Sequence, residues 1–301
     1  MIASSALPDD VVVDLQHVTR VFGEKRALDS VSLRVPRGVV FGLVGANGAG
    51  KTTLIRHVLG LLRAQRGTVR VFDRDPVADP VGVLSRVGYL SEENDLPGWM
   101  RVHELIRYTQ AFYPTWDAEY AEELRRTFQL DLGTKVKHLS KGQKARAGLL
   151  VALAYRPELL VLDEPSSGLD PIVRRDILGA IVRTIADEGR TVLFSSHLLD
   201  EVERVSDCVA MLHRGRLVFA GELDEVKQTY YRLTLRFDGP RDAPPLVEGV
   251  LNWQVTGREW TAIGQGRPGE LEMAVGATGG EVVERRPLSL DEIFLAQVGG
   301  G

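Results

Sequence analysis

The 301-residue sequence has little of several features that would narrow its class at once. It contains one cysteine, Cys208, which excludes an internal disulfide framework and a metal cluster held by several thiolates. We expect Cys208 to be a small buried hydrophobic side chain. The sequence also has no uncharged apolar run that approaches the roughly 18–20 residues needed to span a bilayer as a helix.

Neither sign of charge is in large excess, because 37 basic and 41 acidic side chains leave a net charge of −4. This balance is unlike that of a chain that binds polyanions through its overall charge. The beginning of the sequence, with Asp9 and Asp10 behind Pro8, lacks the basic start and apolar core of a signal peptide. A content of 44% hydrophobic and 26% charged residues is typical of a globular protein. We therefore expect a cytoplasmic protein that depends on another chain for any work at a membrane.

Apolar segments in the first two thirds of the chain predict an α/β core. Residues 31–35 alternate between apolar and polar, whereas residues 39–44 are continuously apolar and indicate a buried strand. This strand leads into the glycine cluster 45–50 and then a helical pattern over residues 52–62. Two further buried strands are predicted at residues 159–162 and 191–194. Buried strands that alternate with helices favour a largely parallel sheet.

The rest of the chain has two other patterns. Residues 96–155 are predicted to be helical, with helices over 117–130 and 145–155. After about residue 228, alternation over 231–237 predicts a half-buried antiparallel strand. Three further strands are predicted in this region, over 251–255, 260–263 and 270–275. Ser289 and Glu292 have the spacing of a capping box and predict a short closing helix.

The sequence between the strand at 39–44 and the following helix matches the pattern G-x-x-x-x-G-K-[ST] in full. Its residues are Gly45, Ala46, Asn47, Gly48, Ala49, Gly50, Lys51 and Thr52. Glycines allow consecutive backbone N–H groups to curl around phosphate oxygens, and the helix presents its positive end to them. Lys51 would reach the β- and γ-phosphates of a nucleotide, and the Thr52 hydroxyl would bind Mg²⁺.

The strand at 159–162 ends in the carboxylates Asp163 and Glu164, followed by Pro165. Asp163 is placed to hold Mg²⁺ through water, and Glu164 is placed to polarise an attacking water. General-base positioning of this kind contributes roughly 10²–10⁴-fold to a rate. By itself, a strand that ends in Asp-Glu-Pro is also compatible with a plain turn. The phosphate loop earlier in the chain favours the catalytic interpretation.

Three weaker motifs each have a structural alternative. Ser140 and Gln143, in the sequence Leu-Ser-Lys-Gly-Gln, fit an ordinary capping box, but the same helix start could bind a γ-phosphate. The sequence Ser-Gly-Leu-Asp that ends at Asp170 could be only a turn into the next helix. His197 could be a histidine at a strand end without any ligand.

Taken in order, these five motifs resemble the nucleotide-binding subunit of ATP-binding cassette (ABC) transporters, over about residues 11–225. The resemblance implies a P-loop NTPase (RecA-like) core with an antiparallel β subdomain and an inserted helical subdomain over about residues 92–156. We expect an ATP-binding domain over residues 1–227 and a small α+β domain over residues 228–301. The expected cofactors are ATP and Mg²⁺.

The resemblance also implies roles for individual residues. Phe22 matches the aromatic residue that stacks on adenine, although a plain core phenylalanine is an alternative. Residues 45–53, which end at Thr53, would bind phosphate and Mg²⁺. Lys51, Glu164 and His197 would act in hydrolysis, with Glu164 as the base and His197 on the γ-phosphate.

Other residues would act across two chains. Ser140, Gly142 and Gln143 would close over ATP bound to a second copy, and Asp170 lies in a loop that crosses the dimer interface. One chain would then supply only half of each active site. Isolated monomers should hydrolyse ATP poorly, and a homodimer is expected.

Two positions depart from the pattern of the family. Glu92 stands where the family usually has Gln, and Lys141 replaces the first glycine of the usual Leu-Ser-Gly-Gly-Gln. Glu92 could still meet the Mg²⁺ shell, but it adds negative charge beside ATP, and Lys141 adds a cation near the phosphate site of the second chain. One hypothesis is that the two charges partly offset each other. The alternative is that they are independent habits of a subfamily.

These departures and the ending Pro287–Phe294 resemble the exporter branch of bacterial ABC ATPases, which work with a separate membrane subunit. Leu96, Pro97, Trp99 and Met100 could form an exposed apolar patch that docks on this subunit, or could be packed inside the helical subdomain. The alternative function is a soluble ABC ATPase coupled to translation or DNA. It is disfavoured by the single cassette, the short helical insertion and the negative net charge, so no nucleic-acid partner is expected. A non-catalytic regulatory ATPase is disfavoured because both Glu164 and His197 are present.

Overall fold

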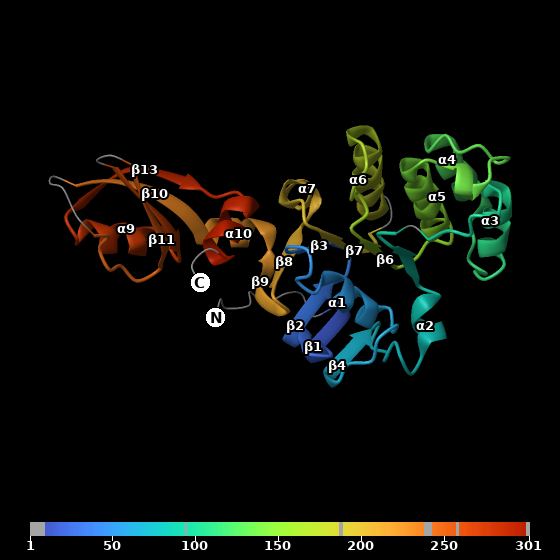
Figure 1. The fold of residues 1–301 in the computed structure, drawn as a ribbon, viewed down its shortest axis with the longest axis horizontal. Coiled ribbons are helices and arrows are strands. Elements are labelled where there is room, and N and C mark those ends of the chain that lie inside the picture. Colours follow the sequence, from blue (N-terminus) through green and yellow to red (C-terminus); the bar gives the residue numbers. More distant parts are fainter. Residues whose placement is uncertain (1–9, 94, 187–188, 238–242, 257–258, 299–301) are drawn as a thin grey trace. The chain divides into compact units, whose positions relative to one another are not determined.

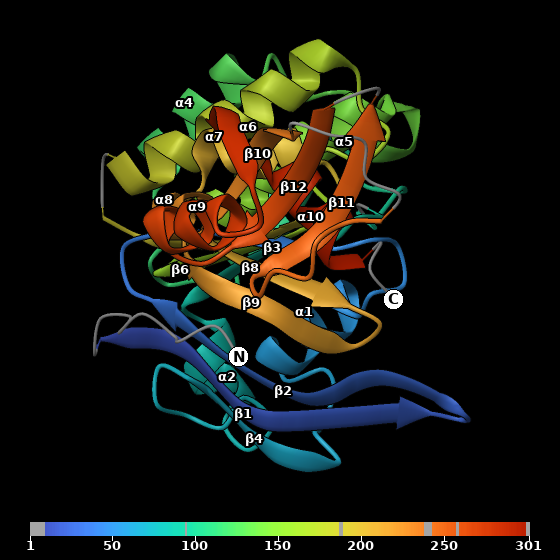
Figure 2. The same cartoon turned by 90° about the vertical axis from the view of Figure 1, so that its left-hand side faces the viewer.

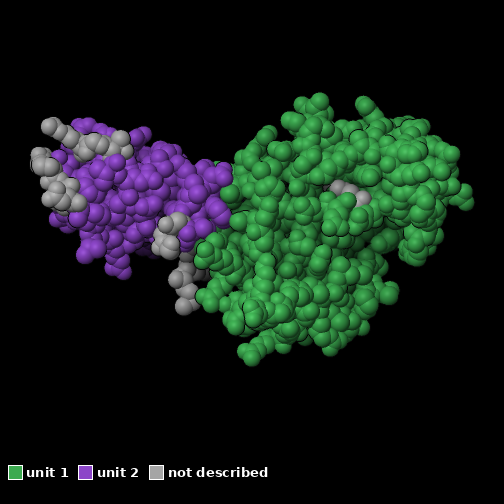
Figure 3. Space-filling model, in the orientation of Figure 1, with its two compact units in different colours: residues 1–220 green, residues 221–301 purple. Residues whose placement is uncertain are grey.

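The computed structural model describes residues 10–93, 95–186, 189–237, 243–256 and 259–298. The chain folds into two compact units, residues 1–220 and residues 221–301, coloured separately in Figure 3. Each unit has a hydrophobic core of its own. The domain boundary expected between residues 227 and 228 lies inside α8 (Leu223–Thr229) and stays a prediction.

The larger unit contains a six-stranded sheet with the strand order β5-β6-β7-β3-β8-β9. The pairs β5–β6, β6–β7, β7–β3 and β3–β8 are parallel. The strands are β3 (Val40–Val44), β5 (Val87–Leu90), β6 (Leu159–Asp163), β7 (Thr191–Ser196), β8 (Cys208–His213) and β9 (Arg216–Glu222). Every residue of β3, β6 and β7 is buried, as their continuous apolar sequences predict. Because these three strands are parallel neighbours, the loops that follow them meet at one edge of the sheet.

A second, antiparallel sheet has the strand order β2-β1-β4, and Figures 1 and 2 show its strands side by side. Its strands are β1 (Val11–Phe22), β2 (Lys25–Pro36) and β4 (Arg66–Val71). Buried residues of β1, β2, β3 and β6 share one core with Leu54, Ile55 and Val58 of α1 (Lys51–Val58). The phosphate loop and its helix are therefore anchored to both sheets.

Helix α1 ends at Val58, whereas the sequence predicts a helix as far as residue 62. Gly60 has a φ of +69°, and a Cβ atom there would lie 2.3 Å from the backbone oxygen of Pro76. A left-handed glycine just past the last turn stops a helix, because the chain then turns away from the axis. The short helix α2 (Pro80–Leu84) follows β4.

The region expected to be helical contains helices, which gather on one side of the larger unit in Figure 1. They are α3 (Val102–Gln110), α4 (Ala118–Thr127), the 3-10 turn Val136–His138 and α5 (Lys141–Leu153). Helix α5 begins at Lys141, before the predicted start at 145, because the side chain of Ser140 accepts a hydrogen bond from the backbone N–H of Gln143. Two more helices, α6 (Pro171–Ala186) and α7 (Leu199–Val205), flank β7 in the sequence.

The smaller unit is a four-stranded antiparallel sheet with the order β11-β12-β10-β13. Its elements are α8, β10 (Tyr230–Phe237), β11 (Val250–Thr256), β12 (Glu259–Gln265), α9 (Pro268–Gly276), β13 (Gly280–Pro287) and α10 (Leu290–Val298). The predicted capping box is confirmed, because the backbone N–H of Ser289 donates to Glu292 at 3.1 Å and that of Glu292 donates to Ser289 at 3.3 Å. Cys208 is buried in β8, also as expected.

One predicted strand is wrong. Residues 270–275 form part of helix α9, not a strand, and the last strand of the sheet is β13. Leu271 and Val275, four residues apart, are buried in the core, whereas Met273 between them is 72% exposed. This burial follows the period of a helix, and Pro268 at the first turn starts it.

Candidate functional site

The phosphate loop joins the end of β3 to the start of α1. Gly50 has a φ of +115°, and a Cβ atom there would lie 2.6 Å from the backbone oxygen of Ala27, so only glycine fits. No side chain caps the start of α1. Its first N–H groups therefore remain available to an anion, and the helix dipole favours one there.

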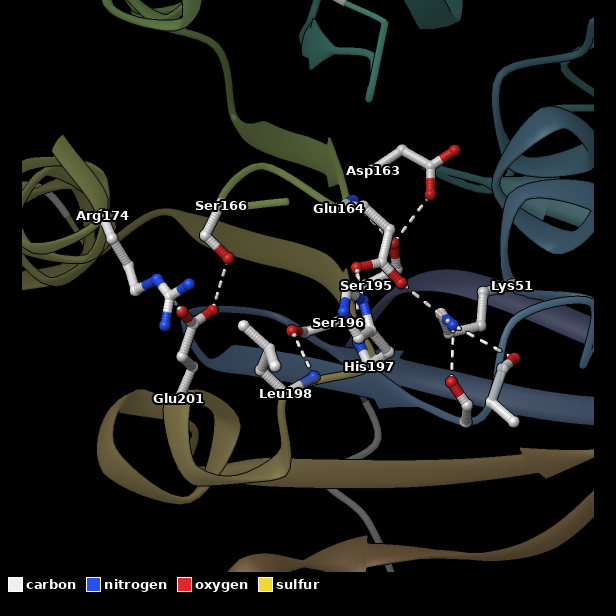
Figure 4. Close-up of polar contacts among 12 residues, drawn as sticks. Lys51, Asp163, Glu164, Ser166, Arg174, Ser195, Ser196, His197, Leu198 and Glu201 are labelled. Atoms are coloured by element: carbon white, nitrogen blue, oxygen red, sulfur yellow. Dashed lines mark hydrogen bonds and ion pairs between the residues drawn. The ribbon is translucent and has the colours of Figure 1, made fainter. Parts of the chain in front are cut away.

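Lys51 folds back over this loop. Its Nζ atom donates to the backbone oxygens of Gly45 at 2.6 Å and Ala46 at 3.4 Å, and lies 3.0 Å from Oε1 of Glu164 (Figure 4). Lys51 and Glu164 are each only 6% exposed. This buried ammonium contacts two carbonyl oxygens and one carboxylate. A phosphate group would be a stronger anionic partner for it than the carbonyl oxygens are.

Glu164 stands at the centre of the site. Its other carboxylate oxygen, Oε2, lies 2.6 Å from Nδ1 of His197 and accepts a weaker hydrogen bond from the backbone N–H of His197 at 3.3 Å (Figure 4). The φ of Glu164 is +48°, a left-handed value that costs a non-glycine residue about 1–3 kcal/mol. Lys51 and His197 therefore hold the carboxylate between them on a strained backbone.

Asp163 ends β6 and is 2% exposed. The hydroxyl of Ser195 donates to Oδ1 of Asp163 at 2.7 Å and accepts from the backbone N–H of Glu164 at 2.9 Å. Burial, with a smaller contribution from the Asp163 carboxylate, raises the pKa of Tyr89 to about 12. Tyr89 therefore stays a neutral phenol near this carboxylate at physiological pH.

A cavity of about 250 Å³ opens beside the phosphate loop. Its lining residues are Lys25, Ala27, Asn47, Gly48, Gly50, Lys51, Thr52, Thr53, Glu92 and Glu164. It brings together the loop, the carboxylate after β6 and Glu92 from the segment after β5. The predicted residues Gly45, Ala46 and Ala49 lie in the loop itself without lining the cavity, and Ala49 is part of the core.

The oxygen donors around the cavity fit a magnesium ion. The hydroxyl of Thr52 and the carboxylate of Glu92 line the cavity, and Asp163 directly precedes Glu164, which also lines it. Hard oxygen ligands of this kind are those that Mg²⁺ prefers. Among the described residues, no group of three or more His, Cys, Asp or Glu side chains could hold a metal ion by itself. Such a sparse set suits a Mg²⁺ ion whose other ligands are phosphate oxygens and water.

Phe22 is not a core residue. Its side chain is 44% exposed at the end of β1, with the Arg20 guanidinium 4.8 Å from the ring centroid. It pairs across the hairpin with Lys25, which lines the cavity. An exposed aromatic ring next to a phosphate cavity is available for stacking on a base.

The other predicted binding residues do not line this cavity in the described part of the chain. Ser140 and Gln143 form a complete capping box at the start of α5, and a Cβ atom at Gly142 would lie 2.7 Å from Val173. The side chain of Asp170 accepts hydrogen bonds from the backbone N–H groups of Ile172 and Val173, at 3.0 and 3.1 Å. These contacts fit the structural alternatives, and a role of these motifs at a second chain stays a prediction.

Lys141, the departure from the family pattern, lies against the loop before α6. A Cβ atom built on Gly168 would lie 2.6 Å from the Lys141 Nζ atom. The apolar patch expected at residues 96–100 is only partly present, because Trp99 is 72% exposed but Met100 is 4% exposed. Met100 faces the interior, so it is not part of a docking surface.

Three residues that contact the site are absent from the predicted set: Ser195, Lys25 and Ala27, the last of which lines the cavity. Ser195 orders both carboxylate residues after β6, and Lys25 adds a second cation to the cavity. Ser195 precedes His197 by two residues at the end of a buried strand, which could have identified it. Lys25 lies only three residues after Phe22, in the hairpin between β1 and β2, but no local pattern marks it as a binding residue.

None of the helices in the described ranges is both long and apolar enough to cross a membrane.

Comparison with known proteins identifies relatives. A family model described as ABC transporter matches residues 28–167. The chain is 35% identical to the uncharacterized ABC transporter ATP-binding protein YhaQ of Bacillus subtilis, over 81% of this chain and 83% of that protein. It is 35% identical to the daunorubicin/doxorubicin resistance ATP-binding protein DrrA of Streptomyces peucetius, over 74% of this chain and 69% of that protein.

One further relative matches nearly the whole chain, and a solved structure is also similar. The bacitracin transport ATP-binding protein BcrA of Bacillus licheniformis is 28% identical over 96% of this chain and 98% of that protein. A solved structure of the ATP-binding subunit of an ABC transporter matches with a TM-score of 0.67 and 30% identity, over 72% of this chain and 92% of that one.

Proposed function

We propose roles in ATP binding and ATP hydrolysis for individual residues of this chain, which belongs to the ABC transporter family. It has the P-loop NTPase fold and is the ATP-binding, ATP-hydrolysing subunit of a transporter. The observation that carries the residue assignments is the contact of Glu164 with both Lys51 and His197 beside the phosphate cavity.

ATP would bind with its phosphates on residues 45–53 and its adenine on Phe22. Lys51 would then turn from the carbonyl oxygens of the loop to the β- and γ-phosphates, because a phosphate is the stronger partner. This leaves Glu164 held by His197 and free to accept a proton from the attacking water. A base placed in this way contributes roughly 10²–10⁴-fold to the rate.

Mg²⁺ would be held by Thr52 and, through water, by Asp163, with Glu92 near its shell. When bound, the ion neutralises charge that develops on the transferred phosphoryl group. Ser195 keeps the Asp163 carboxylate in place by its hydrogen bond. Support for this assignment comes from the hard oxygen donors around the cavity.

The active form works with a membrane permease and pairs two ATP-binding chains. We infer a homodimer in which Ser140, Gly142 and Gln143 of one copy meet the ATP bound to the other, and Asp170 lies in the loop between them. Support comes from the place of these residues outside the cavity of their own chain. A single chain would then hydrolyse ATP poorly.

The permease would dock near Glu92–Arg101, with the exposed ring of Trp99 in the contact. With the permease bound there, the chain would lie on the cytoplasmic face of the cell membrane. Similarity to DrrA and BcrA, whose names refer to drug resistance and bacitracin transport, favours an exporter. A permease that copurifies unchanged with Trp99→Ala would argue against docking at this spot.

The domain division follows from these roles. We propose an ATP-binding domain over residues 1–227, whose helical subdomain spans about 92–156, and an accessory domain over residues 228–301. All of the proposed ATP-contacting residues lie in the first of these. A soluble ABC ATPase that acts in translation or on DNA is not favoured, and no nucleic-acid partner is proposed.

The deciding experiment measures ATP-dependent dimerisation of purified Glu164→Gln by light scattering, with the wild type alongside. Loss of the base should trap ATP between two chains, so the variant should dimerise only with ATP and Mg²⁺. A variant that binds ATP but stays monomeric would refute self-pairing through Ser140. Retained hydrolysis by the variant would refute Glu164 as the base.

A further inference from the structure

A third buried carboxylate, besides Asp163 and Glu164, lies close in sequence to the proposed catalytic residue His197. Glu201 is on α7, four residues after His197, and is 2% exposed. Its Oε2 atom accepts a hydrogen bond of 2.5 Å from the hydroxyl of Ser166, and its Oε1 atom lies 2.9 Å from Nε of Arg174 (Figure 4). None of the proposed roles in ATP binding or hydrolysis uses this carboxylate.

The partners of Glu201 come from two other segments of the chain. Ser166, 1% exposed, follows Glu164 by two residues, in the loop after β6. Arg174 lies in the first turn of α6, and its backbone N–H donates to the backbone oxygen of Asp170 at 3.0 Å. One carboxylate therefore joins the segment after Glu164, the helix after His197 and the start of the helix that Asp170 caps.

The burial of Glu201 has an electrostatic cost. Burial raises the pKa of Glu201, since desolvation penalises the charged carboxylate, and only the contacts with Ser166 and Arg174 oppose this effect. A buried ion pair often contributes no more to stability than an apolar side chain of the same size, but it demands one geometry. The contacts of Glu201 therefore constrain how the three segments are placed more than they stabilise the fold.

We propose that Glu201 is a positioning residue for hydrolysis. It keeps the side chains of His197 and Glu164 in the relative position that hydrolysis needs, and it connects both residues to the interface loop at residues 167–170. Contact of that loop with a second subunit would shift the start of α6, and Arg174 would pass the shift through Glu201 to α7 and His197. The inference rests on the proposed roles of Glu164 and His197.

Glu201→Gln tests the link. The amide keeps an oxygen that can accept from Ser166 but removes the charge that pairs with Arg174. We expect kcat for ATP hydrolysis to fall about tenfold, because small misplacements of catalytic groups cost this much or more, while KM and the ATP Kd change less than about twofold. Arg204→Gln is the matched control, because it removes one charge from an exposed side chain three residues after Glu201 on the same helix and should keep the wild-type kcat.

Ser166→Ala is a second variant that decides the matter if Glu201→Gln fails to fold. It removes the hydroxyl that donates to Glu201 and leaves the Arg174 contact, so kcat should again fall with little change in KM. A wild-type kcat in a folded Glu201→Gln or Ser166→Ala protein, or a loss that appears only in KM, overturns the proposal. Glu164→Gln, run in the same assay, separates the two ideas, because activity retained there refutes the proposed base instead.

Discussion

At the scale of single residues, the candidate site depends on contacts that fix the positions of its carboxylate side chains. Glu164 adopts a left-handed backbone conformation with a φ of +48°, and its carboxylate contacts Lys51 on one side and His197 on the other. Ser195 contacts both Asp163 and the backbone of Glu164. A general base is effective only when its geometry is held in this way.

Phe22 provides the most direct test of a binding assignment. We predict that Phe22→Ala raises the Kd for ATP about tenfold, because stacking of an aromatic ring on a base contributes about 1–3 kcal/mol. Isothermal titration calorimetry with ATP would measure this change. The melting temperature should change little, because the ring is 44% exposed and packs outside the core.

The conservative variant Phe22→Tyr should keep the wild-type Kd, since it retains the ring. A triphosphate without a base should bind Phe22→Ala and the wild type equally well. If Phe22→Ala binds ATP as tightly as the wild type, adenine lies elsewhere.

Site residues at the ends of buried strands can be predicted from the sequence. Contacts between residues that are far apart in the sequence cannot. Residues 45–52, Asp163 and Glu164 follow apolar runs whose ends can be located from local pattern. The contact of Glu164 with Lys51 depends on strands β3 and β6, which are separated by more than a hundred residues and are not direct neighbours in the sheet. Lys25 enters the cavity through the hairpin register, which no motif encodes.

At the scale of elements, α9 shows how a short segment can be misread. Residues 270–275 alternate between acidic or small residues and larger apolar ones, which fits a strand. In a strand, Leu271, Met273 and Val275 would share one face. In the structure only Leu271 and Val275 are buried, since a helix places residues four apart on one side.

We predict that Leu271→Ala lowers the free energy of unfolding by about 2–5 kcal/mol, because it empties a buried site in the core of the smaller unit. Met273→Ala is the matched control and should cost less than about 0.5 kcal/mol, since Met273 is 72% exposed. Urea unfolding followed by circular dichroism would measure both. Equal losses at residues 271 and 273 would favour a strand over the helix.

The starts of β5 and β6 are joined by an ion pair that should respond to pH. Nε and a terminal nitrogen of Arg86 contact the two carboxylate oxygens of Glu158 at 2.5 and 2.7 Å. The hydrogen bond with the Arg86 guanidinium holds the pKa of Glu158 below its usual value. A lowered folded-state pKa contributes stability that is present above the unfolded pKa and is lost as pH falls through the folded value.

We therefore predict that Glu158→Gln lowers stability at pH 7 by at most about 1 kcal/mol, because Glu158 is 45% exposed and solvent screens the pair. The gap to the wild type should narrow as pH falls below 4.5, the ordinary value for this carboxyl, and close at lower pH. Melting curves over this pH range would show it. Glu248→Gln, at an exposed loop position, serves as control, and a gap that is constant with pH would contradict the prediction.

At the scale of the whole molecule, the two departures from the family pattern lie in different places. Glu92 lines the phosphate cavity, whereas Lys141 lies at the start of α5, against Gly168. Lys141 does not line the cavity of its own chain within the described residues. If its charge offsets that of Glu92, the effect must act between two copies, in the proposed homodimer where the start of α5 would close over the other copy's ATP.

This hypothesis predicts that the effects of substitutions at Glu92 and Lys141 depend on each other only when two chains dimerise. Glu92→Gln removes a negative charge beside ATP and should promote ATP-dependent dimerisation, more so in a Lys141→Gly background, where no cation compensates Glu92. A double-mutant cycle on the dimerisation constant should give an interaction energy of about 0.5 kcal/mol or more. ATP binding to the monomer, measured at low protein concentration, should show no such coupling, because one chain alone does not bring the two charges to one phosphate. Additive effects on dimerisation would mean that Glu92 and Lys141 act independently.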